Sequence, residues 1–68
     1  MNIAVIGVGS MGQNHARVLF NLDSVQLVAV VDADKQQAER VAKRYNARWY
    51  TSYTELFDKE QLDAVTIA

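Results

Sequence analysis

The sequence predicts an α/β fold, part of a doubly wound parallel sheet, and three observations support this. Four short apolar runs alternate with three segments of helical periodicity, in the order βαβαβαβ. A glycine-rich turn, Gly7 to Gly12, joins the first apolar run to the first helical segment. The connections are short, and parallel strands are joined by right-handed crossovers, so sheet order 3-2-1-4 is the economical topology. We therefore expect the first two helices on one face of the sheet and the third on the other.

The first strand and the first helix flank the glycine turn. Ile3–Ile6 are apolar on both faces, as in a parallel strand that is covered on both sides. The helix is expected from about Met11 to Leu22, and a turn over residues 21–24 leads into the second strand, Val25–Val31. The helix residues expected to face the sheet are Gly12, Ala16 and Leu19.

The second helix has the clearest periodicity. It is expected from about Lys35 to Tyr45, with Asp34 as its N-cap and Gln37 at its third position. Asn46 is suited to a left-handed helix stop. The residues expected to face the sheet are Ala38, Val41, Ala42 and Tyr45.

The last third of the chain predicts a short strand, a short helix and a final strand. Arg48–Tyr50 is the strand, and the capping box Ser52–Glu55 opens a helix. In that helix we expect Leu56 and Phe57 to face inward. Asp63 leads into the fourth strand, which runs to Ala68 and lacks the polar, capped ending usual for a domain. We therefore expect residues 1–68 to be the N-terminal piece of a longer protein.

Composition argues against several classes of protein. The chain has 68 residues, no cysteine and a net charge of −1 with both signs interspersed, which disfavours a nucleic-acid or membrane-surface partner. No apolar run approaches the roughly 18 residues of a membrane span, and the N-terminus lacks the pattern of a signal peptide. A metal site is not expected, because the single His15 has neither cysteine nor a second histidine to pair with. A cytoplasmic location is the default.

The glycine turn has the spacing G-x-G-x-x-G of the Rossmann dinucleotide fingerprint. Gly7 would permit the tight turn, Gly9 would let the backbone approach a pyrophosphate, and Gly12 would let the helix pack closely on the sheet. The N–H groups near Ser10 and Met11 would be free donors at a helix N-terminus, and the Ser10 hydroxyl could add another hydrogen bond. The simpler alternative is that the glycines only form a tight turn.

Asp32 follows the second apolar run, about 20 residues after Gly12. A carboxylate at this point accepts hydrogen bonds from the adenine ribose and repels a 2′-phosphate, so NAD is favoured over NADP. Lys35 is close enough in sequence to weaken that preference. The alternative is that Asp32 is only a turn or cap residue.

Other candidate residues have a structural interpretation beside the functional one. A lone histidine on a helix, here His15, is more often structural than a cofactor contact. Met11 is equally suited to filling the core and to lining the cofactor site. The remaining residues of this kind are expected to be packing aromatics around the third strand or a solvated helix face; they are Trp49, Tyr50 and Tyr53, and Glu39, Arg40, Lys43 and Arg44.

Taken together, these segments resemble the glucose–fructose oxidoreductase/inositol dehydrogenase (Gfo/Idh/MocA) family. The resemblance covers essentially the whole chain and is more specific than the glycine motif alone. The segments that carry it are Val5–Gly12, His15–Leu19, Leu27–Asp32, Ala38–Tyr45, Ser52–Leu56 and Asp63–Ala68.

The resemblance implies an NAD(P)-dependent oxidoreductase acting on sugars, polyols or related small molecules. Such proteins have an N-terminal Rossmann domain and a C-terminal α+β domain that binds substrate and forms homo-oligomers. The family's phosphate loop corresponds to Gly7, Gly9, Ser10, Met11 and Gly12, its ribose acid to Asp32, and its backbone near the cofactor to Ala68. The family's Thr-Pro segment, Glu-Lys-Pro motif and later histidine have no counterpart in these residues. We therefore expect no catalytic residue here and an inert chain.

Two other classes of protein fit the glycine turn and Asp32. One is a non-catalytic NAD-binding regulatory module of the potassium-transport type, and the other is a methyltransferase, whose glycine loop usually has another shape. A Glu-Lys-Pro segment in the full-length gene would favour the dehydrogenase. Because the fourth strand would have a bare outer edge, we also expect the chain to self-associate or to be only marginally stable.

Overall fold

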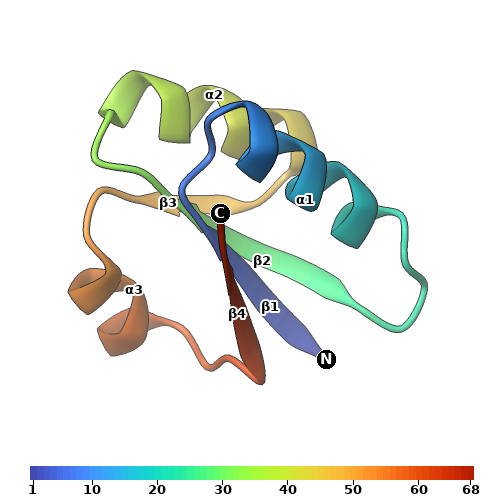
Figure 1. Cartoon of the computed structure of the whole chain (residues 1–68). Helices are drawn as coiled ribbons and strands as arrows, with labels where there is room; N and C mark the ends of the chain where they lie inside the picture. Colours follow the sequence, from blue (N-terminus) through green and yellow to red (C-terminus); the bar gives the residue numbers. More distant parts are fainter.

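A computed structural model describes all 68 residues, and the seven expected elements are present in the expected order. Figure 1 shows them along the chain. Their bounds are β1 (Asn2–Ile6), α1 (Ser10–Phe20), β2 (Gln26–Val31), α2 (Lys35–Tyr45), β3 (Arg48–Tyr50), α3 (Tyr53–Lys59) and β4 (Ala64–Ile67).

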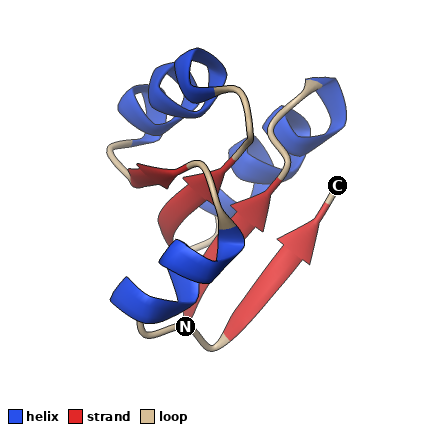
Figure 2. Cartoon of the chain, turned by 90° about the vertical axis from the view of Figure 1, so that its left-hand side faces the viewer, coloured by secondary structure: helices blue, strands red, loops and turns tan.

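The four strands form one parallel sheet in the order β3-β2-β1-β4, which confirms the predicted topology. Helices α1 and α2 cover one face and α3 covers the other (Figures 1 and 2). The register of β1 against β2 shifts between Ile3 and Ala4, where Leu27 and Ala29 are the successive partners. Val28 is the extra residue of this bulge, so β2 does not alternate strictly between the two faces.

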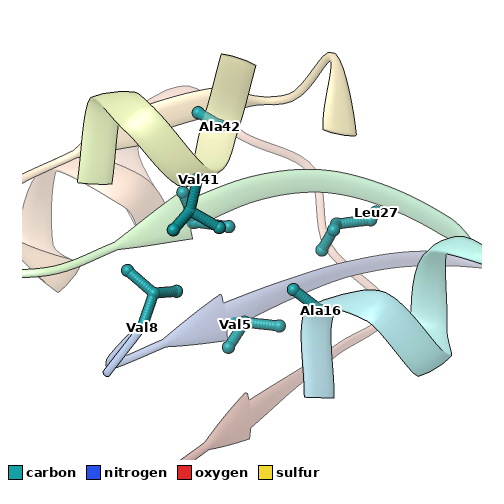
Figure 3. Close-up of a cluster of buried hydrophobic side chains, with 7 residues drawn as sticks. Val5, Val8, Ala16, Leu27, Val41 and Ala42 are labelled. Atoms are coloured by element: carbon teal, nitrogen blue, oxygen red, sulfur yellow. The ribbon is translucent and has the colours of Figure 1, made fainter. Parts of the chain in front are cut away.

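Each face of the sheet has its own apolar cluster. Figure 3 shows the cluster between the sheet and the first two helices, where side chains of β1, β2, α1 and α2 meet. This cluster consists of Val5, Val8, Ala16, Leu27, Val30, Val41 and Ala42. The cluster under α3 consists of Ala4, Val28, Ala29, Val31, Tyr50 and Leu56. The two central strands, β1 and β2, are therefore covered on both faces, as in a parallel sheet, whereas the edge strand β4 is half-buried or exposed.

The helix ends follow the predicted capping residues. The Asp34 carboxylate accepts hydrogen bonds from the N–H groups of Gln36 and Gln37, and Asn46 ends α2 with φ of 55°. The Ser52 hydroxyl accepts hydrogen bonds from the N–H groups at positions 54 and 55, at the start of α3. These local interactions explain why the bounds of α2 were predictable.

Two expectations about the helices are wrong. Helix α1 ends at Phe20 rather than near Leu22, because Asn21 leaves the helix and its side-chain amide donates to the Arg17 carbonyl at 2.8 Å. Phe57 does not face inward and is 54% exposed. Helix α3 has only seven residues and buries Leu56 alone, while the Phe57 ring packs against Tyr53 with centroids 6.4 Å apart.

None of the helices has both the length and the apolar character needed to cross a membrane.

Candidate dinucleotide site

The glycine turn lies at the carboxyl edge of the sheet, and two of its glycines are sterically required. Gly7 has φ of +87°, a backbone conformation that other residues rarely adopt. A Cβ on Gly12 would lie 1.7 Å from the Gly7 carbonyl oxygen, so α1 can approach the turn only without a side chain there. Gly9 differs, because a Cβ on it would meet nothing within 4 Å. The turn therefore leaves open space at its middle glycine.

The N-terminus of α1 presents free hydrogen-bond donors. Gly9 is the N-cap and provides no side-chain cap, and the first backbone bond of the helix runs from the Gln13 N–H to the Gly9 carbonyl. The N–H groups of Ser10, Met11 and Gly12 have no protein acceptor. Met11 is 66% exposed, so it does not fill the core. This end of the helix, with its partial positive charge, is suited to an anion.

Asp32 follows β2 and connects the glycine turn to the start of α2. Its Oδ2 atom accepts hydrogen bonds from the Val8 N–H at 2.9 Å and from Gln37 Nε2 at 3.2 Å. Its Oδ1 atom accepts one from the Asp34 N–H at 2.8 Å. Asp32 therefore shapes the turn before α2 and also holds the glycine turn in place.

Hydrogen bonding keeps the Asp32 carboxylate ionised. Burial alone would raise the pKa of Asp32, but the donors on Val8, Asp34 and Gln37 outweigh it and lower the pKa below its usual value. At neutral pH the group therefore carries its negative charge. Lys35, which could have weakened a preference for NAD, lies instead with Nζ 5.9 Å from the centre of the Trp49 ring.

A cavity of about 510 Å³ opens at the same edge, beside Asp32. Its walls come from the carboxyl ends of β1 and β2 and from the segment that leads into α3. The lining residues are Ile6, Gly7, Val31, Asp32, Ala33, Thr51, Ser52, Tyr53 and Thr54. The sequence alone does not identify Ala33 or the segment 51–54 as site residues, and the interpretation of Tyr53 as a packing residue is at odds with its exposure of 62%. The predicted sheet order could have revealed these residues. Because β3 lies next to β2 in a parallel sheet, the residues that follow the two strands lie at the same edge of the sheet.

Ala68 lies beside the glycine turn, as Figure 1 shows for the C-terminus and the loop after β1. Its N–H donates to the Ile6 carbonyl at 3.0 Å, and its carbonyl oxygen would lie 3.1 Å from a Cβ on Gly7. The seven residues predicted for the site therefore gather around the carboxyl ends of β1, β2 and β4. His15 stands apart, half-buried in a separate cavity of about 260 Å³ near Thr66, with no partner for Nδ1.

A buried carboxylate that the sequence did not reveal anchors the helix behind the cavity. Glu60 follows α3, its side chain is 7% exposed, and it accepts hydrogen bonds from the Arg48 guanidinium and the Tyr50 hydroxyl. The bonds from Arg48 lower the pKa of Glu60 despite its burial, while burial and the bond to Glu60 raise the pKa of Tyr50. This cluster fixes α3 against β3 and with it the segment 51–54.

A parallel α/β sheet in this order, with a glycine turn opening its first helix, defines the class of NAD-binding Rossmann domains. More specifically, residues 1–68 match the model of the Gfo/Idh/MocA family, described as an oxidoreductase family with an NAD-binding Rossmann fold, and the chain belongs to that family. The match confirms the resemblance seen in the sequence. It favours an oxidoreductase over a regulatory module or a methyltransferase.

Relatives of known activity are similar over the whole of this chain. An inositol 2-dehydrogenase from Renibacterium salmoninarum is 39% identical over 69 residues, which are 100% of this chain and 21% of the relative. A 4-carboxy-2-hydroxymuconate-6-semialdehyde dehydrogenase from a Sphingobium strain is 34% identical over 68 residues, 98% of this chain and 22% of the relative. This chain therefore spans about a fifth of the length of these relatives.

Solved structures agree with the fold in detail. The myo-inositol dehydrogenase from Lactobacillus casei, in complex with NAD(H) and myo-inositol, superposes with a TM-score of 0.89 at 35% identity. The superposition covers 100% of this chain and 21% of that one. The myo-inositol 2-dehydrogenase from Lactobacillus plantarum gives 0.91 at 36% identity, with the same two coverages.

Proposed function

We propose that this chain is the cofactor-binding part of an NAD-dependent dehydrogenase that acts on a sugar, a polyol or a related small molecule. One observation carries the proposal. The free N–H donors of α1, the ionised Asp32 carboxylate and a cavity of about 510 Å³ share one edge of the sheet. In open α/β sheets, ligands bind at this edge, outside the carboxyl ends of the strands.

In this proposal the pyrophosphate rests on the N-terminus of α1. The N–H groups of Ser10 and Met11 donate to it, Gly9 leaves room for it, and Gly7 and Gly12 shape the turn. Asp32 accepts a hydrogen bond from the adenine ribose, and the neighbouring cavity receives the adenosine. Ala68 contributes backbone near the cofactor.

The preference for NAD over NADP rests on charge. An ionised Asp32 would repel a 2′-phosphate, and Lys35, turned toward Trp49, does not offset that repulsion. The Lactobacillus casei relative, whose complex holds NAD(H), supports the same preference.

We assign no catalytic role to any of the 68 residues. The bound cofactor would supply the hydride chemistry, and this chain would bind and orient the adenosine half. The relatives are about five times longer than this chain, so the substrate and the residues that act on it belong to the whole protein. We propose that the whole protein is a homo-oligomer and that this chain alone does not turn over substrate.

The proposal is tested by titrating the ¹⁵N-labelled chain with NAD, NADP and adenosine while recording backbone amide shifts. NAD should move the amide signals of Ser10, Met11 and Gly12 and those beside the cavity, and adenosine only the latter. NADP should bind more weakly than NAD. Tighter binding of NADP, or no response at the N-terminus of α1, would contradict the proposal.

A further inference from the structure

Gln37 has an unexpected partner. It is half-buried at the third position of α2, where a capping box would turn its amide back to the N–H of Asp34. Instead, Gln37 Nε2 lies 3.2 Å from Asp32 Oδ2, and the Asp34 N–H donates to Asp32 Oδ1. Both groups that would close a capping box therefore bind Asp32.

These bonds use most of the acceptor capacity of Asp32. A carboxylate has about four acceptor positions, two on each oxygen. The Val8 N–H and Gln37 Nε2 fill both positions on Oδ2, and the Asp34 N–H fills one on Oδ1. One position, on Oδ1, is left for a ligand.

Gln37 is the one side-chain donor among these three groups. The other two donors are backbone N–H groups, which any residue at their positions would supply. The amide is uncharged, so it orients the carboxylate without neutralising it. With Lys35 held over Trp49, no cation competes for the same oxygen.

We propose that Gln37 is a positioning residue that restricts Asp32 to one hydroxyl of the adenine ribose. This role rests on the proposed NAD site. There, Asp32 Oδ1 accepts a hydrogen bond from a single ribose hydroxyl. Gln37 occupies Oδ2 and so prevents the carboxylate from binding both hydroxyls of the ribose at once. Leucine at this position would release Oδ2 and allow that second contact.

The first test needs no nucleotide. The pKa of Asp32 is measured by ¹³C NMR in the wild type, in Gln37→Leu and in Gln36→Leu. Gln36 is an exposed neighbour whose side chain makes no hydrogen bond, so it is the matched control. Gln37→Leu should raise the pKa of Asp32 and Gln36→Leu should leave it unchanged. An unchanged value in Gln37→Leu overturns the inference.

The second test compares NAD with its 2′-deoxyadenosine and 3′-deoxyadenosine analogues. In the wild type, loss of one hydroxyl should weaken binding about tenfold and loss of the other by less than about twofold. In Gln37→Leu both losses should weaken binding, and Gln36→Leu should behave as the wild type does. If the two analogues lose the same amount of affinity in the wild type, the single-hydroxyl contact is overturned, even though NAD itself binds. If the wild type binds no NAD at all, the proposed function fails together with the ribose contact, whatever the pKa of Asp32 does.

Discussion

Gly9 and Gly12 belong to one motif but have different surroundings. An alanine Cβ at position 12 would overlap the Gly7 carbonyl, which is backbone and cannot move aside, whereas at position 9 it would enter open space. We expect Gly12→Ala to lower the free energy of unfolding by about 3 kcal/mol. Gly9→Ala should cost about 1 kcal/mol or less, the effect of a poorer helix N-cap. Urea denaturation followed by circular dichroism measures both, and equal losses would contradict this account of the turn.

At the level of single residues, the sequence predicted the glycines better than it predicted Asp32. The glycine spacing reflects local backbone geometry, and a motif records it directly. The hydrogen bonds that Asp32 accepts from Val8 and Gln37 depend on how β2, α2 and the turn pack together, which no local pattern encodes. For the same reason, the sequence alone could not decide whether Met11 is exposed or fills the core.

Among the elements, α3 depends most on a contact distant in sequence. It has seven residues and buries only Leu56, too little to hold an isolated helix in place. The buried Glu60, bonded to Arg48 and Tyr50 of β3, provides the additional attachment. Capping residues and periodicity predicted the bounds of α2 and the start of α3. They could not predict that Glu60 is buried or that Phe57 is exposed, because both depend on which face α3 turns to the sheet.

The attachment by Glu60 should be visible in the pH dependence of stability. We expect Glu60→Gln to lower the free energy of unfolding at pH 7 by about 1–2 kcal/mol, because a charge-assisted bond to Arg48 is lost. The pKa of Glu60 is lowered in the folded chain from 4.5, so this stabilisation is present above pH 4.5. It is lost as the pH falls through the folded-state pKa. The gap between wild type and variant should therefore close in acid.

Denaturant midpoints measured from pH 7 down to pH 3 check this. Asp58→Asn is the matched control, because Asp58 is exposed on the same helix and has no hydrogen-bond partner. The control should follow the wild type at every pH. A gap between Glu60→Gln and the wild type that does not change with pH would mean that the amide disturbs packing rather than charge.

For the molecule as a whole, the topology could be predicted because short connections and parallel strands allow few arrangements. The cavity beside Asp32 could not be predicted, since its walls come from segments after three different strands and their spacing depends on the packed structure. The two edges of the sheet also differ. Both edge strands leave one side of the backbone unpaired, but β3 has only three residues and β4 has four.

The free edge of β4 leads us to expect that this chain associates with a second copy of itself. The Ala68 N–H bonds to β1, so alternation along the strand turns the N–H of Ile67 to the free side. Ile67 is 74% exposed, and Met11 and Val18 of α1 are also exposed. An unpaired, apolar edge can pair with another strand, and a lysine on it opposes such pairing.

Light scattering after size exclusion should show dimers or larger species that increase with concentration. Ile67→Lys should shift the chain toward monomer, and Ile67→Val should behave as the wild type does. A wild type that stays monomeric at about millimolar concentration would contradict this prediction. The physical reason would then be that β4 is too short to pair with another strand.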